Sequence, residues 1–386
     1  MKRLAALLLT LVMALSLVAC DGNSRETPTP APSTPVETAA ATPSAAPVTP
    51  TPAATPTPET RIVRGDDGNE VEIPYTITRA APVIGAFAQM TEMLTGGGGK
   101  IVAAAVNNIS DYFKQVFPDY LVSNPNNYAS GSVEDLIAAG AQVAYGPSQI
   151  FSDDQRNQLA AADIAYVPID NITTVDGMCS AFLIIGEILG EEEYARAQQF
   201  VEYYRGNVEL CQERVSGVPE AERVTFLSLF YSADAYTTIN GRDICNEYIE
   251  AAGGVNLAKD YSPAAGSNSL TVDLEQIVAW NPQFIMTSNQ SGKAAILADP
   301  ALQTVDAVIN GNVQVCPYGV YLWSVRSGEG SMLPLWLGTN MYPELFTDID
   351  MEATVTDFFS TWYNYSIPAD ELERTLAGDA STAMMR

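Results

Sequence analysis

The sequence contains no histidine among its 386 residues. The sequence therefore lacks the residue that three kinds of site usually require. These are zinc hydrolase sites, Ser-His-Asp and Cys-His nucleophilic sites, and the histidine-rich sites of zinc or manganese receptors. Basic residues are also scarce, since 19 Lys and Arg stand against 46 Asp and Glu, for a formal net charge of -27. This acidic balance disfavours nucleic acids and anionic membrane surfaces as partners, because both would be repelled.

Cysteine is sparse and widely spaced. Cys20 lies near the start, and the other four are Cys179, Cys211, Cys245 and Cys316. No C-x-x-C pair occurs, so the spacing does not indicate a zinc or iron-sulfur site. In an exported chain these four residues form either two disulfides, in one of three pairings, or buried free thiols, and both alternatives stay open.

The first twenty residues predict export. Lys2 and Arg3 precede an apolar run that is too short to span a bilayer, and the run closes with Leu17-Val18-Ala19-Cys20. A small-residue site ending in cysteine resembles the bacterial lipoprotein pattern. It implies a signal peptide over residues 1–19, cleavage before Cys20 and acylation of its thiol, so that the protein is anchored to the outer face of the cytoplasmic membrane. A plain secretory peptide is the alternative.

Residues 20–60 are dominated by Thr, Pro, Ala and Ser. Such a segment has too little apolar surface to offset the entropy of ordering, and its prolines favour extended, solvated backbone. We therefore expect a tether between the lipidated cysteine and a folded body that begins near residue 61. A mucin-like stalk would have a similar composition, but no other feature of the chain favours it.

The remaining residues are enough for two lobes, and 47% of the whole sequence is hydrophobic. A Gly/Asp turn between alternating apolar residues predicts a β-hairpin at 61–73. Strand and helix patterns then alternate, including a helix at 81–94, a strand at 100–106 and a helix at 351–363. This alternation predicts an α/β fold with mostly parallel sheets covered by helices. We assign residues 61–175 to an N-terminal lobe and 217–386 to a C-terminal lobe.

Residues 176–216 form a predicted helical segment between the two lobes. Apolar spacing indicates helices at 176–189 and 191–215, separated at Gly190, with Glu191 in a first turn that suits the helix dipole. The second helix would be about 37 Å long at 1.5 Å per residue. It is long enough to join two Rossmann-like lobes as a single stiff bridge.

One pattern occurs in both halves. Residues 133–144 and 274–285 share a glutamate, aliphatic residues, alanine and a following strand at the same offsets, 141 residues apart. The repeat predicts two similarly built lobes that each present a glutamate, Glu134 or Glu275, at a helix start.

These features resemble the bacterial ABC-transporter substrate-binding proteins of the iron-siderophore, haem and cobalamin type. The resemblance covers roughly residues 61–375, and its most specific stretches are residues 186–190, 271–282, 305–313, 335–338 and 342–346. It implies two α/β lobes joined by one long helix, a ligand held between them without chemical change, and ABC permease and ATPase subunits as partners. No cofactor is expected.

In that family, one glutamate on each lobe docks against arginines of the permease, and the matching positions here are Glu134 and Glu275. Two exposed carboxylates suit this role, because they would orient the protein by charge-assisted bonds. The alternative is that both glutamates only stabilise their helices. With Ser132 and Asp273 as N-caps, both glutamates fall in a first helical turn, where the dipole favours a carboxylate.

Ligands of open α/β sheets bind beyond the carboxyl ends of the strands. The loops at these places are rich in Tyr, Asn and Gln, which favours a wide organic ligand such as a metal chelate over a bare ion. Each tyrosine is also compatible with a structural role. The candidate ligand-binding residues are Asn107, Asn108, Tyr112, Tyr145, Gln149, Tyr231, Tyr236, Asn289, Tyr321, Trp323 and Arg326.

Arg326 follows the aromatic loop in an arginine-poor chain. Its guanidinium suits a carboxylate or the anionic groups of a ferric siderophore, and the alternative is an ion pair with Glu329 or another nearby acid. A corrinoid or haem stays an alternative ligand, although the strongest axial ligand for either is missing. An exported carbohydrate-active enzyme would also be acidic and aromatic-rich, but the matched glutamates and the bridging helix favour transport.

Overall fold

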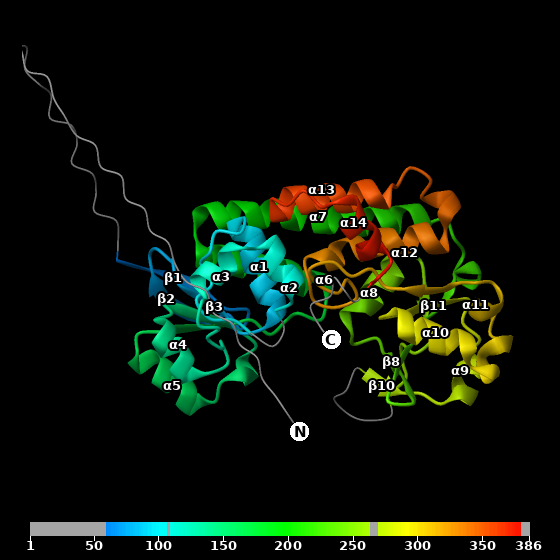
Figure 1. Cartoon of the computed structure of the whole chain (residues 1–386), viewed down its shortest axis with the longest axis horizontal. Helices are drawn as coiled ribbons and strands as arrows, with labels where there is room; N and C mark the ends of the chain where they lie inside the picture. Colours follow the sequence, from blue (N-terminus) through cyan, green and yellow to red (C-terminus); the bar gives the residue numbers. More distant parts are fainter. Residues whose placement is uncertain (1–58, 106–108, 263–268, 380–386) are drawn as a thin grey trace, which may run out of the picture. The chain divides into compact units, whose positions relative to one another are not determined.

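The computed structural model describes residues 59–105, 109–262 and 269–379 (Figure 1). Cys20, most of the Thr/Pro-rich segment, Asn107 and Asn108 lie outside these ranges. Within the described residues, no helix combines the length and apolar character needed to cross a bilayer.

The first lobe contains a hairpin and a small parallel sheet. The hairpin joins β1 (Thr60–Arg64) to β2 (Glu70–Pro74), as the Gly/Asp turn predicted. The sheet has the order β3-β4-β5, with bounds Ala80–Pro82, Val143–Gly146 and Ala165–Pro168. Its helices are α1 (Gly85–Thr95), α2 (Asp111–Val116), α3 (Asp119–Ser123), α4 (Val133–Ala139) and α5 (Asp153–Ala161).

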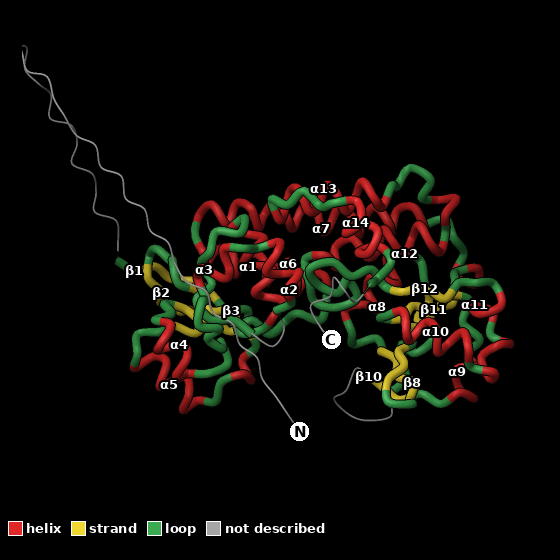
Figure 2. Tube along the Cα trace, in the orientation of Figure 1, coloured by secondary structure: helices red, strands yellow, loops and turns green. Residues whose placement is uncertain are grey.

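The second lobe has a parallel sheet of order β12-β11-β6-β9 and an antiparallel sheet of order β10-β8-β7. Figure 2 shows its strands among helices and loops, as in the first lobe. The strands are β6 (Thr225–Ser228), β7 (Phe230–Ser232), β8 (Ala235–Ile239), β9 (Val255–Asn256), β10 (Ser269–Thr271), β11 (Phe284–Thr287) and β12 (Val313–Val315). The helices are α8 (Ile244–Ala251), α9 (Leu274–Trp280), α10 (Gln290–Ala298), α11 (Asp306–Ile309), α12 (Leu333–Met341), α13 (Met351–Tyr363) and α14 (Ala369–Leu376). Short 3-10 turns occupy Ser148–Ile150, Glu220–Glu222, Pro300–Thr304, Glu329–Met332 and Pro343–Leu345.

A long helix bridges the lobes, as predicted. After α6 (Val175–Leu189), the chain turns at Gly190 into α7 (Glu191–Val215), which packs against α1 of the first lobe and against α8 and α12 of the second. Helix α13 lies along α7 (Figure 1), where Phe200 contacts Phe358 and Trp362 with ring centroids 6.4 and 4.9 Å apart. One hydrophobic cluster therefore continues from the first lobe through α7 into the second.

A close approach of α6 and α7 depends on Gly186. A Cβ at this position would lie 2.9 Å from the Glu193 carbonyl oxygen and 2.8 Å from the Ala197 Cβ. We expect Gly186→Ala to lower the free energy of unfolding by about 1 to 2 kcal/mol, because the backbone of α7 must move away. Gly206→Ala is the matched control on α7, since no atom lies within 4 Å of its added Cβ. Its better helix propensity should raise stability by about 0.5 to 1 kcal/mol, and chemical denaturation measures both effects.

Three predicted segments differ in the structure. The helix expected at 81–94 starts at Gly85, because Ala80–Pro82 forms β3 and proline favours extended backbone in the residue before it. The strand expected at 100–106 is reduced to single bridges from Ile101 to Ala80 and from Ala104 to Ala129, since the chain changes partner within three residues. Tyr231 to Tyr236 is not a loop, because Ala233 and Asp234 adopt positive φ and form a tight hairpin turn between β7 and β8.

The four described cysteines are buried free thiols, which decides the alternative that the sequence left open. Burial raises the pKa of Cys316 to about 12 and also raises the pKa of the other three thiols. These side chains therefore act as small apolar core groups at neutral pH.

Candidate functional site

The candidate residues of the first lobe lie in different environments. Tyr145 on β4 is fully buried, and its hydroxyl lies 2.5 Å from the Thr91 hydroxyl. Tyr112 on α2 is also buried and donates to Glu371 Oε2 over 3.0 Å. Gln149 is exposed. Both tyrosines thus have satisfied hydroxyls in the core, and only Gln149 presents its side chain to solvent.

In the second lobe, the candidates lie on the β7–β8 hairpin and at the start of α10. Tyr231 and Tyr236 pair across the hairpin with ring centroids 5.0 Å apart, and the buried Tyr236 donates to Asp299 Oδ2 over 3.0 Å. Asn289 caps α10, because its Oδ1 accepts from the Gly292 N–H over 2.7 Å. Tyr231 and Asn289 are half-buried.

The loop between β12 and α12 is held by a buried carboxylate, Glu329. Its Oε1 accepts from the Tyr363 hydroxyl over 2.6 Å and from the Tyr321 N–H over 3.1 Å, and its Oε2 accepts from Trp323 Nε1 over 2.9 Å. Burial raises the pKa of Glu329 to about 7, although these hydrogen bonds oppose the rise. Trp323 is fully buried and therefore serves the loop's structure.

The same loop also contacts the first lobe. Gln89 on α1 accepts from the Gly328 N–H over 2.9 Å and donates to Tyr363 over 2.6 Å. The Ala86 backbone, at the start of α1, lies near the Tyr321 hydroxyl, where it opposes the burial that raises the pKa of that phenol. The Gln89 side chain thus fastens this loop of the second lobe to α1 of the first lobe.

Arg326 is half-buried in this loop and forms no ion pair with any acid of the described ranges. The alternative of an ion pair with Glu329 is wrong, because both oxygens of that carboxylate accept from Trp323, Tyr321 and Tyr363. The positive charge of Arg326 lies close enough to Tyr321 to oppose the burial that raises the pKa of that phenol to about 12. Within the part of the chain that the structure describes, no acidic side chain therefore neutralises the Arg326 guanidinium.

The expected aromatic lining is mostly core. Tyr112, Tyr145, Tyr321 and Trp323 belong to the hydrophobic cluster around α7, and Tyr236 belongs to the core of the second lobe. Of the expected aromatic residues, only Tyr231 is more than slightly exposed. The structure therefore does not gather these rings into one exposed surface.

The repeated segments have the same local structure in both lobes. Ser132 caps α4 through the Asp135 N–H, and Asp273 caps α9 through the Gln276 N–H. Each helix ends in a left-handed residue, Gly140 or Asn281. Glu134 and Glu275 are both exposed in the first turn.

A glutamine completes the repeat. Gln142 Oε1 accepts from the Thr78 and Arg79 N–H groups over 2.8 and 3.0 Å, and Gln283 Oε1 accepts from the Thr225 N–H over 2.9 Å. Each glutamine thus ties the helix-to-strand turn to the chain entering the neighbouring strand. The repeat seen in the sequence is therefore a structural repeat, with one exposed glutamate per lobe.

Residues 83–318 match the family model described as periplasmic binding protein. The chain belongs to this family. The similarity of this periplasmic binding protein to a known relative extends over most of its length. The molybdate-binding protein MolA of Haemophilus influenzae is 23% identical over an alignment of 353 positions, which covers 81% of this chain and 94% of MolA.

Solved structures have the same two-lobed fold. A periplasmic solute-binding protein of Veillonella parvula covers 84% of this chain and 98% of its own, with a TM-score of 0.70 and 20% identity. MolA bound to molybdate covers 80% of this chain and 99% of its own, with a TM-score of 0.63 and 22% identity. CeuE of Helicobacter pylori with Ni(II) bound covers 82% and 99%, with a TM-score of 0.62 and 17% identity. At these identities the likeness shows the fold alone.

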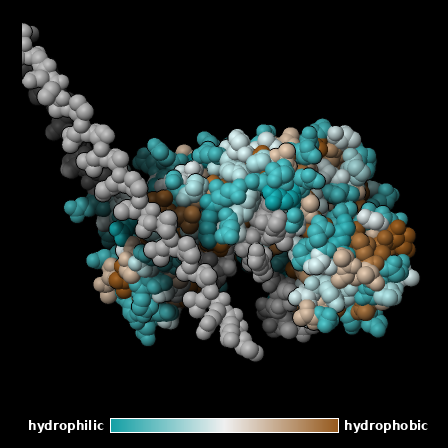
Figure 3. All heavy atoms as spheres, in the orientation of Figure 1, coloured by the Kyte–Doolittle hydropathy of each residue, from teal (hydrophilic) through white to brown (hydrophobic). Residues whose placement is uncertain are grey.

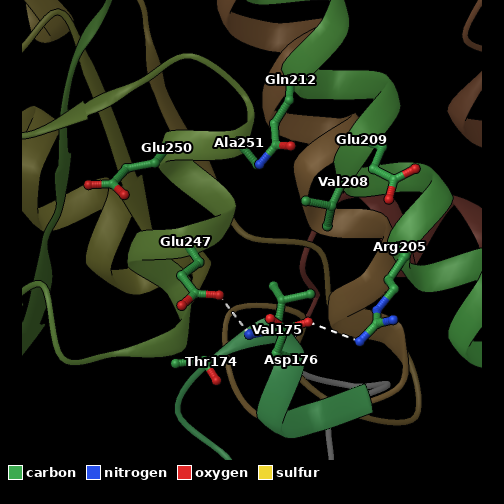
Figure 4. A pocket seen from close by; sticks show the side chains of 10 residues that line it. All are labelled: Thr174, Val175, Asp176, Arg205, Val208, Glu209, Gln212, Glu247, Glu250 and Ala251. Atoms are coloured by element: carbon green, nitrogen blue, oxygen red, sulfur yellow. Dashed lines mark hydrogen bonds and ion pairs between the residues drawn. The ribbon is translucent and has the colours of Figure 1, made fainter. Parts of the chain in front are cut away.

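This periplasmic binding protein also has a cavity of about 880 Å³ between α6, α7 and α8 (Figure 4). Its acidic lining residues are Asp176, Glu209, Glu247 and Glu250. Arg205, its one basic lining residue, pairs with Asp176 over 3.0 Å. Glu247 Oε2 accepts from the Val175 N–H over 2.6 Å. An excess of carboxylates repels an anion, so the cavity suits a cationic ligand, whereas Arg326 suits an anionic one.

The sequence did not identify Glu329 as the organiser of the Arg326 loop. The sequence did contain one signal, because Glu329 stands between two glycines. In the structure, a Cβ at Gly328 would clash with Met93, and a Cβ at Gly330 would lie too close to the Tyr248 hydroxyl. Two glycines around one acid indicate a densely packed backbone. Among the described residues, no group of three or more Cys, Asp or Glu is arranged to hold a metal ion.

Proposed function

We propose that this chain is the lipid-anchored substrate-binding component of an ABC importer. It captures an anionic metal chelate of the ferric-siderophore type between its lobes and delivers it unchanged to the permease. Cys20 carries the anchor, and Glu134 and Glu275 dock the two lobes onto the permease.

The observation that carries the proposal is the unpaired guanidinium of Arg326. An ion of either sign that is partly removed from water is costly unless a partner compensates it. No carboxylate of the described residues pairs with Arg326, although the chain has far more acids than bases. A ligand with carboxylate, hydroxamate or catecholate oxygens supplies that partner, and a planar guanidinium binds such groups bidentately.

The start of α1 supports an anion at the same place. Ile84 at its N-cap provides no side-chain acceptor, and the Ala86 backbone, like Arg326, opposes the burial that raises the pKa of Tyr321. The partial positive charge at this helix start therefore adds to the charge of Arg326.

A small oxyanion such as molybdate is the second candidate. The specific observation in its favour is the burial of the expected aromatic rings, which reduces the flat surface available to a large organic ligand. The relative from Haemophilus influenzae is named for molybdate, and a free guanidinium suits an oxyanion as well as a chelate.

Replacing Arg326 tests the site. We expect Arg326→Ala to weaken binding of the anionic ligand roughly 10- to 100-fold, because a hydrogen-bonded charge contributes about 1.5 to 3 kcal/mol. Arg326→Lys should keep part of the affinity, because it retains the charge but loses the planar fork. Arg64→Ala is the control, since Arg64 forms an exposed ion pair with Glu70 in the β1–β2 hairpin. Equal affinities of wild type and Arg326→Ala would contradict the assignment.

Titration of the full chain in detergent identifies the ligand. The panel is ferric hydroxamate and catecholate siderophores, molybdate, haem and cobalamin, followed by fluorescence of the 4 Trp and 18 Tyr and by calorimetry. Tight binding of a siderophore supports the first candidate, and tight binding of molybdate supports the second. Binding of haem or cobalamin alone would replace both, and glycan hydrolysis without binding would indicate an exported carbohydrate-active enzyme.

A further inference from the structure

Exposed aliphatic side chains accompany the repeated glutamates. Three residues after Glu134, Ile137 is 49% exposed, and three residues after Glu275, Val278 is 37% exposed. The next residue, Ala138 or Ala279, is exposed in both helices. Residues three and four apart lie on one helix face, so each helix presents a carboxylate beside an apolar patch.

Packing within the chain does not account for this pattern. Buried aliphatic residues, Val133 and Leu136 on α4 and Ile277 on α9, already supply the contact with each lobe's core. Only ten large hydrophobic side chains are exposed among the described residues, and two of them occupy the same position of the repeat. A scattered exposed aliphatic residue needs no explanation, but the same one in both lobes indicates a shared role.

We infer that Ile137 and Val278 are the apolar anchors of the permease-docking surface. The inference rests on the proposed function and adds a partner chemistry to it. The partner has two similar halves, and each half offers a basic group beside a shallow apolar socket. Helices α4 and α9 lie toward the lower side of Figure 1, one in each lobe, so a partner on that side can reach both helices.

The carboxylates and the aliphatic side chains contribute to docking in different ways. An exposed carboxylate steers and orients the encounter but contributes modestly to affinity once water screens it. An aliphatic anchor that becomes buried in a socket contributes in proportion to the apolar area removed from water and slows dissociation. The glutamates therefore govern recognition of the basic partner, and Ile137 and Val278 hold the complex together.

The test uses full-length protein in cells that lack the native copy. A photo-reactive amino acid replaces Ile137, Val278 or Ile309 in separate variants. Ile309 is the matched control, because it is an aliphatic residue with 63% exposure that lies outside the repeat, on α11. Figure 3 shows a hydrophobic patch over α11 on an otherwise mostly hydrophilic face, so this control also tests non-specific apolar contact. We expect crosslinks to an ABC permease subunit from positions 137 and 278 and none from 309.

Uptake of a radiolabelled ferric siderophore or molybdate, whichever the titration selects, measures the functional effect. Ile137→Ser combined with Val278→Ser should lower uptake roughly tenfold or more, as loss of two interface anchors does, with unchanged ligand affinity and unchanged melting temperature. Ile309→Ser should leave uptake at the wild-type level.

The outcomes separate this inference from the proposed function. Wild-type uptake in the double serine variant, together with lost uptake after charge reversal at Glu134 and Glu275, overturns the anchors but leaves the docking glutamates. Wild-type uptake in both pairs of variants overturns docking by these helices altogether. Crosslinks from positions 137 and 278 only to lipid, or to a second copy of this chain, also overturn the inference.

Discussion

Combining Glu134→Lys with Glu275→Lys is expected to lower ligand uptake roughly a hundredfold, while ligand affinity of the purified protein stays unchanged. Both carboxylates are exposed and lie far along the chain from Arg326. In the proposed docking, reversal would place two positive charges against basic groups of the permease, which removes attraction and adds repulsion in each lobe. Uptake by complemented cells and calorimetric affinity of the same variants measure the two effects.

The control must separate docking from helix stability, because a lysine in a first helical turn also opposes the helix dipole. Glu352→Lys provides it. Glu352 is exposed in the first turn of α13, which Asp350 caps, but it does not belong to the repeat. We expect Glu352→Lys to lose about as much stability as either single reversal, within about 1 kcal/mol, and to transport normally. If wild type, the Glu134→Lys and Glu275→Lys double variant and Glu352→Lys all show equal uptake, the two repeated glutamates have a structural role only.

Glu92→Gln is expected to raise the free energy of unfolding by about 2 to 3 kcal/mol at pH 7. Glu92 lies on α1, is completely buried, and neither of its carboxyl oxygens has a hydrogen-bond partner among the described residues. Burial, with a smaller contribution from Asp119, raises the pKa of Glu92 from 4.5 to about 8. The folded protein must therefore keep a proton on this carboxyl at a pH where the unfolded chain would release it.

The sign of the pH dependence follows from this difference. Between pH 4.5 and about 8 the folded state binds more protons at Glu92 than the unfolded state, so stability falls as pH rises through that window. Glu329, whose pKa burial raises to about 7, acts in the same direction. Glutamine cannot ionise, so the Glu92→Gln variant should differ little from wild type at pH 4.5 and increasingly at pH 7 and 8.

Urea denaturation at pH 4.5, 7 and 8 measures this effect. Glu202→Gln is the control, because it makes the same chemical change at an exposed glutamate on α7. If wild type and Glu92→Gln lose stability equally between pH 4.5 and 8, then Glu92 is not the source of the pH dependence.

Local sequence patterns predicted the elements that bury a regular apolar face against the core. The bounds of α7 and α13 agree with their apolar periodicity, because each helix buries one face against a continuous core. The β7–β8 hairpin was missed because Ala233 and Asp234 occupy its left-handed turn positions without the usual Asn-Gly signal. The short β3 was missed because apolar spacing alone does not separate three strand residues from the start of a helix.

The sequence singled out Arg326 as a candidate but did not predict the surroundings of its side chain. Strand-end loops were located from the alternation of elements, and Arg326 was singled out as a scarce cation. Whether Arg326 had an acidic partner depended on where Glu329 pointed. That carboxylate turns inward to Trp323 and Tyr363, and this orientation arises from packing between residues far apart in the chain.

The amino-acid sequence by itself determined the α/β character of the protein, its long bridging helix and its duplicated glutamate, because periodicity, capping residues and offsets are local properties of the chain. Only the tertiary structure decided that the candidate tyrosines and tryptophan are mostly core, that the four cysteines of the described ranges are free thiols and that no acid in those ranges pairs with Arg326. Burial and pairing depend on which distant segments meet, and no local pattern records those contacts.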